Sequence, residues 1–161
     1  MENRQKGITL IEILIVGAIL GILFGFTIVN LRSVQSSASV TSLITQLSAD
    51  IHNQQLMAMM GQTQDAQLSS SYGIHFDTDK YILFQGDTYD PSNQQNLAID
   101  LDSNLSLQQI TFPQGTLIFQ AHSGVVKNFA QNTSSFDLVE KNSGKRETIQ
   151  INALGVLTSA D

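Results

Sequence analysis

The sequence contains no cysteine, and ionised side chains are scarce, because Asp, Glu, Lys and Arg make up 14% of its 161 residues. The lack of cysteine excludes disulfide bonds, cysteine-ligated zinc or iron–sulfur centres and a cysteine nucleophile. Cations are scarcer than anions, with 8 Lys and Arg against 14 Asp and Glu, for a net charge of −6. Nucleic-acid-binding proteins need clustered cations to meet phosphates, so this balance argues against that class. The length fits one domain with an appended segment.

Motifs for catalysis and cofactor binding are also missing. His52, His75 and His122 show no metal-ligand spacing, and there is no GxSxG, GxGxxG or GxxxxGK[ST] motif. Closely spaced aspartates suit calcium, but the EF-hand glutamate is absent and aspartate is common in turns. These acid pairs are Asp77/Asp79, Asp87/Asp90 and Asp100/Asp102. We therefore expect no enzymatic activity, no cofactor and no metal ion, and we expect the aspartates to form turns.

A long apolar run lies near the N-terminus. Residues 13–29 carry no charge, and the whole run spans 22 residues interrupted only by Thr9 and Glu12. As a helix, 22 residues reach about 33 Å, which is enough to cross a bilayer core of about 30 Å. The preceding segment MENRQKG carries two cations. Cations hold their side of a membrane helix in the cytoplasm, so we expect the remainder of the chain on the outside.

Three plainer interpretations of this run compete, and one of them, a buried core helix, would be shorter and interrupted by polar residues. A secretory signal peptide has a shorter apolar run, of about 7–15 residues, followed by a small-residue cleavage site. Ser36, Ala38 and Ser39 imitate such a site. A simple membrane anchor explains the run but leaves the carboxylate of Glu12 unexplained.

Glu12 is unusual because a carboxylate at the centre of a bilayer costs about 2.5–3.5 kcal/mol on insertion scales. Residues of this kind usually have a function. If the chain is cut after Gly7, the new ammonium of Ile8 lies one helical turn from Glu12. Glu12 of the same or a neighbouring subunit can then neutralise it, because paired ions cost far less in lipid than single ones.

The segment KGITLIE, residues 6–12, resembles the leader junction of type IV pilins and type II secretion pseudopilins. The resemblance implies that prepilin peptidase, a membrane aspartyl protease, cuts after Gly7 and methylates the amine of Ile8. It implies that Glu12, the fifth mature residue, acts in assembly. The implied partners are other pilin or pseudopilin subunits, an inner-membrane assembly platform with its ATPase, and membrane lipid. Many major pilins have proline where this chain has Val29, which favours a minor subunit.

Gly17, Gly21 and Gly25 recur every four residues and therefore lie along one helix face. Small residues at this spacing let helices pack closely in lipid. Glycine is also common in membrane helices generally, so both interpretations stay open.

Beyond Leu31 the sequence becomes polar but keeps a helical period, which predicts one helix from about Ile8 to about Met60, with Gly61 as its C-cap. The apolar stripe of its second half consists of Val40, Leu43, Ile44, Leu47 and Ile51. Four residues at its end are expected to pack in the core rather than to form a partner-binding surface. They are Leu56, Met57, Met59 and Met60.

The rest of the chain predicts a head of six to eight antiparallel strands and no helix, because short apolar alternations are separated by turn residues. The strands are expected near residues 72–76, 81–84, 105–112, 117–121, 136–138, 148–151 and 155–157. The amphipathic helix would cover the buried face of the sheet. The predicted fold class is α+β, a long N-terminal helix, transmembrane in its first half, packed on an antiparallel β head. The predicted segments are a leader (1–7), a transmembrane or filament-core helix (8–31), an amphipathic half-helix (32–61) and the head (62–161).

Three head segments, YGIHFDTDKYILF, GTLIFQAHSG and ETIQINALGVL, resemble the pilin-like heads of H-type minor pseudopilins and FimT-like minor pilins. Some FimT-like pilins bind DNA through C-terminal cations, so Lys141, Lys145 and Arg146 are candidates for nucleic-acid contact. The acidic head opposes this, and a solvated hairpin is the favoured interpretation.

Taken together, these patterns predict a structural minor pseudopilin or pilin without enzymatic activity, acting in protein export or pilus assembly. The precursor would sit in the inner membrane with its N-terminus in the cytoplasm and its head outside, and would then enter a filament. The alternatives are an uncleaved, membrane-anchored binding domain outside the cytoplasm and a DNA-binding minor pilin for DNA uptake.

Overall fold

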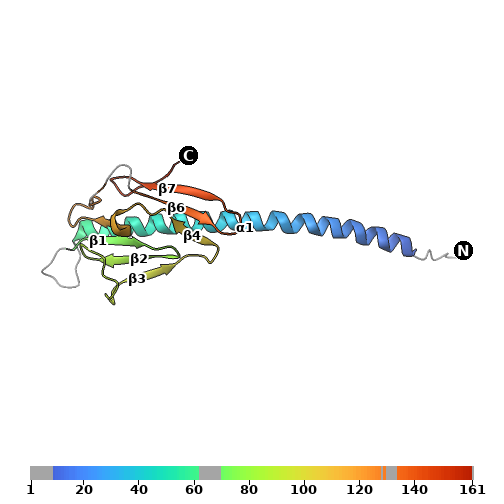
Figure 1. Ribbon diagram of the computed structural model, residues 1–161, viewed down its shortest axis with the longest axis horizontal. Coiled ribbons are helices and arrows are strands. Elements are labelled where there is room, and N and C mark those ends of the chain that lie inside the picture. The colour runs from blue at the N-terminus through green and yellow to red at the C-terminus, as the bar shows by residue number, and fades with distance from the viewer. Residues whose placement is uncertain (1–8, 62–69, 128, 130–133, 161) are drawn as a thin grey trace, which may run out of the picture. The chain divides into compact units, whose positions relative to one another are not determined.

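The computed structural model describes residues 9–61, 70–127, 129 and 134–160, and for residues 26–38, 159 and 160 it describes the backbone alone. Within these residues the chain forms one α-helix, one short 3-10 helix and eight β-strands (Figure 1). The predicted α+β class is therefore confirmed. The chain divides into two compact units, Met1–Ala38 and Ser39–Asp161.

The helix α1 (Leu10–Met60) contributes to both units. It begins after Thr9, whose carbonyl oxygen accepts a hydrogen bond from the backbone N–H of Glu12 at 3.1 Å. It ends before Gly61, whose φ of 62° is the left-handed conformation that glycine adopts at helix C-caps. The predicted end of the helix is confirmed, and its predicted start at Ile8 lies outside the described residues.

In the first unit, the described side chains are those of residues 9–25, and all of them are exposed. Among the residues that the structure describes, no helix combines the length and the apolarity needed to cross a membrane. The transmembrane character of the first half of α1 remains a prediction.

The second unit contains two four-stranded antiparallel sheets. The strand order is β3-β2-β1-β5 in one sheet and β4-β6-β7-β8 in the other. Eight strands agree with the predicted six to eight. The strands are β1 (Tyr72–Phe76), β2 (Lys80–Gln85), β3 (Leu97–Asp100), β4 (Leu105–Gln108), β5 (Thr116–Phe119), β6 (Ser135–Glu140), β7 (Arg146–Ile151) and β8 (Leu157–Ala160).

The C-terminal half of α1 and both sheets share one hydrophobic core (Figure 1). Leu47 and Ile51 are each 2% exposed, and Leu43 is also buried. Val40 and Ile44 are partly buried and pack against the same core. The predicted apolar stripe of the helix is therefore confirmed, and burial of each such side chain stabilises the fold by about 1.5–3 kcal/mol.

Polar contacts join α1 to the head at several points along its second half. The hydroxyl of Tyr81 on β2 donates a hydrogen bond to Asp50 at 2.6 Å. Burial, together with the Asp50 carboxylate, raises the pKa of Tyr81, so the hydroxyl keeps its proton. Farther along α1, the amide of Gln55 donates to the carbonyl oxygens of Gly124 at 2.9 Å and Leu154 at 3.0 Å. These bonds attach two head loops to the last turns of the helix.

The predicted core packing at the end of α1 is wrong for three of its four residues. Met57 packs against the core, but Leu56, Met59 and Met60 are 44%, 51% and 53% exposed. The buried face at this end of the helix instead passes through Ala58, which is fully buried. Residues two positions apart lie on nearly opposite sides of a helix. The burial of Ala58 therefore leaves the side chains of Leu56 and Met60 exposed.

Parts of the head also differ from the prediction. No strand was expected at β3, which is an edge strand whose Leu97 is 59% exposed, so it lacks the alternating buried face that reveals a strand. β4 stops at Gln108 rather than near residue 112, because Gln109 adopts a positive φ of 48°. β8 starts at Leu157 rather than 155, because Gly155 lies in a turn with φ of 76°. A short 3-10 helix, η1 (Pro113–Gly115), occurs where no helix was expected.

Candidate functional site

Large apolar side chains dominate the described part of the first unit. Eleven of them between Leu10 and Phe24 are each 48–84% exposed. They occupy so many positions of α1 that every side of the helix is apolar. Such a helix is typical of one that lies in a membrane or among other helices, and exposed apolar surface of this extent marks an interaction surface.

Glu12 is the acidic residue in the first turn of α1, and its side chain is exposed. A carboxylate at this position interacts favourably with the positive end of the helix dipole, by about 0.3–1 kcal/mol. That contribution helps the helix begin but is smaller than the cost of a charge within lipid. The predicted cleavage and methylation site, Gly7 and Ile8, lies outside the described residues.

The three glycines of the predicted packing face, Gly17, Gly21 and Gly25, lie within α1. A Cβ atom placed on any of them meets no atom within 4 Å. Their small size is therefore not required by packing within the described part of this chain. Close approach of a second helix stays a prediction for this face.

The sequence around this first turn also matches a known motif. Residues 3–28 match the prokaryotic N-terminal methylation motif. This motif is the signature of type IV pilin-like and pseudopilin proteins. The methylation motif implies a membrane-anchored precursor, processing by a prepilin peptidase and assembly with other pilin subunits. Comparisons with curated proteins and with solved structures found no match.

In the head, one member of each predicted acid pair shapes a turn. Asp77 accepts a hydrogen bond from the backbone N–H of Thr78 at 2.8 Å. Asp90 accepts two bonds from Ser92, and these bonds lower the pKa of Asp90. Asp102 likewise accepts the backbone N–H of Asn104 at 3.0 Å. Among the described residues, no group of three or more His, Asp or Glu is arranged to hold a metal ion.

The three histidines belong to different elements. His52 is on α1, His75 on β1 and His122 in the turn after β5. The ring of His75 stacks on Tyr89 with centroids 4.1 Å apart. Burial lowers the pKa of His75, while the charge of Asp77 acts in the opposite direction. The ring of His75 thus packs against the loop that carries Tyr89.

The candidate nucleic-acid residues surround the β6–β7 hairpin, but two of them make bonds within the head. Arg146 donates to the carboxylate of Asp137 at 2.9 Å, and the side chain of Asp137 is only 6% exposed. Lys141 donates to the carbonyl oxygen of Ser103 at 2.9 Å. The side chain of Lys145 makes no hydrogen bond or ion pair in the described part of the chain. Of the three hairpin cations, Lys145 is therefore the one whose side chain has no partner among the described residues.

The carboxylate of Asp137 also accepts hydrogen bonds from residues other than Arg146. The hydroxyl of Thr148 donates to its other oxygen at 2.7 Å. The side-chain amide of Gln109 faces both members of this ion pair. In the orientation that pairs donors with acceptors, the amide nitrogen of Gln109 donates to Asp137 at 3.1 Å, and its amide oxygen accepts from Arg146 at 3.0 Å. This complete network makes Arg146 part of the structure of the head.

Replacing Arg146 by alanine is expected to lower the free energy of unfolding by about 1–3 kcal/mol, because the buried carboxylate of Asp137 loses its charged donor. Lys145→Ala is the matched control and should change it by less than about 0.5 kcal/mol. Urea unfolding of the purified variants measures both. A gel-shift salt series with Lys145→Ala tests DNA binding directly. Equal stability of the two variants would contradict the structural role of Arg146.

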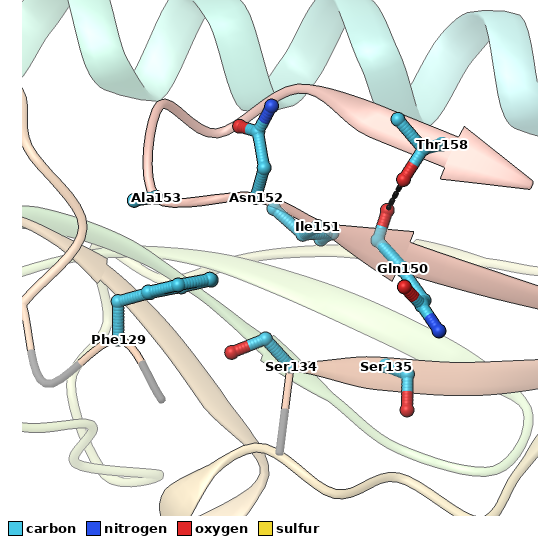
Figure 2. A pocket seen from close by; sticks show the side chains of 8 residues that line it. All are labelled: Phe129, Ser134, Ser135, Gln150, Ile151, Asn152, Ala153 and Thr158. Carbon is cyan, nitrogen blue, oxygen red and sulfur yellow. Dashed lines mark hydrogen bonds between the residues drawn. The ribbon is translucent and has the colours of Figure 1, made fainter. Parts of the chain in front are cut away.

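A pocket of about 630 Å³ lies in the head beside the start of β6 and the end of β7 (Figure 2). Its lining includes Phe129, Ser134, Ser135, Gln150, Asn152 and Thr158. Gln150 and Asn152 fall in the segment ETIQINALGVL, but no motif in the sequence indicates that they share a pocket with Phe129 and Ser134. Only the pairing of β6, β7 and β8 brings them together.

Proposed function

We propose that this protein is a structural minor subunit of a type II secretion pseudopilus or a type IV pilus, without enzymatic activity. The observation that carries the proposal is the methylation motif at residues 3–28, in the same chain as an exposed, apolar helix with one acidic residue. A subunit of this kind needs a helix that is stable in lipid before assembly and among other helices after it.

Residues 8–31 would hold the precursor in the cytoplasmic membrane. Eleven exposed apolar side chains on α1 support this, because burial of each contributes about 1.5–3 kcal/mol. The two cations of the leader would keep the N-terminus in the cytoplasm and place the head outside. The platform protein and the ATPase of the assembly machinery would then move the helix from lipid into the filament.

Within the filament, Glu12 would neutralise the N-terminal ammonium of Ile8 on its own or a neighbouring subunit. The position of Glu12 in the first turn of α1 supports this, since it lies one turn from the new terminus. The stripe of Gly17, Gly21 and Gly25 would let neighbouring helices approach closely.

A minor pseudopilin of the H type is the favoured subclass, on the three head segments that resemble it and on Val29 in place of proline. DNA uptake is less favoured, because Arg146 is engaged by a buried carboxylate and the chain is acidic. An uncleaved membrane-anchored binding domain is distinguished by its leader, which would stay in place.

The proposed topology predicts that the chain fractionates with membranes and that external protease digests the head in spheroplasts. Reversing the leader charges, with Arg4→Glu and Lys6→Glu together, should reduce the accessible fraction, because cations hold the N-terminus inside. Lys145→Glu makes one such charge reversal in the head and serves as control. Recovery of the wild-type chain in the soluble fraction, or a head protected from protease, would contradict the proposed topology.

A further inference from the structure

The pocket in the head has a polar row on one side and an aromatic ring on the other. Ser135 pairs directly with Gln150, and Gln150 pairs with Thr158 across the β6–β7–β8 ladder. Directly paired residues point to the same face of a sheet, so these three polar side chains form a row. Figure 2 shows the ring of Phe129 on the opposite side, with Asn152 and Ser134 on the flanks. The volume of the pocket, about 630 Å³, lies in the usual range for small-molecule sites, about 300–1,000 Å³.

The lining excludes ionic ligands. Of its described residues none is ionisable, and the polar groups are amides and hydroxyls. Farther along the same two strands, Asp137 and Arg146 form an ion pair with each other. An anion would need Arg or Lys, and a metal ion would need carboxylates. A purely apolar ligand is disfavoured as well, because it would cover the side-chain amide of Gln150 without giving it a hydrogen bond.

The backbone of the pocket is already used. The N–H of Ile151 donates to Ser134, the N–H of Thr111 donates to Ser135, and the carbonyl of Gln150 accepts from Thr158. The N–H of Asn152 donates to the carbonyl of Val156. A peptide that adds a strand needs free backbone groups, and β6 and β7 are each paired on both sides.

Two of the residues that line the pocket have side-chain amides with unused hydrogen-bonding capacity. The oxygen of Asn152 accepts the backbone N–H groups of Leu154 and Val156, which leaves its NH₂ group for a ligand. The amide of Gln150 makes no hydrogen bond with the described residues, and it offers both a donor and an acceptor. The ligand must therefore be neutral and able to donate and accept on one side.

We propose that this pocket binds a neutral sugar residue, with Phe129 against its apolar C–H face and Gln150 and Asn152 bonded to its hydroxyls. A pyranose ring combines an apolar face with hydroxyls that both donate and accept, which matches the two sides of the pocket. Aromatic rings recognise such flat apolar faces, while amides fix the orientation. The inference does not depend on filament assembly.

Saturation-transfer NMR on the full-length chain tests this proposal. The chain is kept in a zwitterionic detergent, because sugar-headed detergents would compete. The probes are the methyl glycosides of glucose, galactose and N-acetylglucosamine, with glucuronate as the charged counterpart and a Gly-Ser peptide as the neutral non-sugar. Phosphatidylcholine vesicles with and without a neutral glycolipid distinguish a lipid-borne sugar from a free one. At least one neutral glycoside is expected to bind, and glucuronate and the peptide are not.

Gln150→Ala is expected to weaken binding about two- to tenfold, because one net hydrogen bond is lost. Phe129→Leu keeps apolar volume but removes the flat face, and should weaken binding to a similar extent. Gln94→Ala, an exposed glutamine in the loop before β3, is the matched control and should bind as wild type. Gln150 is exposed, so its variant remains folded and interpretable even if Phe129→Leu does not fold.

Three results would overturn the proposal. They are no transfer to any neutral glycoside, unchanged affinity in Gln150→Ala, and binding of the peptide in place of the sugars.

Discussion

The mature chain, isolated from cells that contain a prepilin peptidase, is expected to begin at Ile8 with a methylated amine. The match of residues 3–28 to the methylation motif supports this, and the resemblance of residues 6–12 to pilin leader junctions implies that the leader ends at Gly7. In cells without the peptidase, the chain should keep Met1. N-terminal mass spectrometry of membrane fractions distinguishes the two forms directly.

Gly7→Val should block this processing almost completely, because it places a branched side chain at the bond to be cut. Gly17→Val makes the same chemical change ten residues farther along, where a Cβ meets no atom within 4 Å, and should be cut normally. An intact leader in wild-type cells would exclude the pilin interpretation and favour the uncleaved anchor. Cleavage without methylation would separate the two chemical steps.

The second large effect is expected at Glu12. Glu12→Gln keeps the size of the side chain and removes its charge, so the ammonium of Ile8 would enter the helix bundle unpaired. A single charge in an apolar environment costs about 2.5–3.5 kcal/mol on insertion scales. The ratio of filament-associated to membrane-associated subunit should therefore fall by at least about tenfold. Immunoblots of sheared filaments and membranes measure this ratio.

Two further variants define what Glu12 contributes. Glu12→Asp keeps the charge and should retain more assembly than Glu12→Gln. Glu147→Gln makes the same neutralisation on β7 of the head and should assemble normally. If Glu12→Gln enters filaments at wild-type levels, the proposed pairing does not exist. If it is no longer cleaved, Glu12 acts in recognition by the peptidase instead.

The helix was the most predictable part of this chain. Its apolar stripe, which includes Leu47 and Ile51, follows the helical period, and Gly61 supplies the conformation needed to end it. Alternating strands such as β1 and β2 were found for the same reason, since period and burial agree there. Leader cleavage was inferred from residues 6–12 through a resemblance, and its atoms lie outside the described residues.

Features that depend on tertiary contacts were missed. The exposure of Leu56 and Met60 follows from the burial of Ala58, which the composition of that segment does not reveal. The engagement of Arg146 depends on Asp137, which only the β6–β7 pairing brings alongside. The pocket depends on the order of the strands in the second sheet, and no single segment carries its pattern.

One continuous helix contributes to both compact units of this protein. Within the second unit, the apolar stripe of the helix is packed in the core of the head. To extract α1 from the head, a longitudinal force must slide Leu43, Leu47 and Ile51 out of their contacts together. Simultaneous shear of several buried contacts resists force better than peeling them one by one, so the helix is built to carry tension.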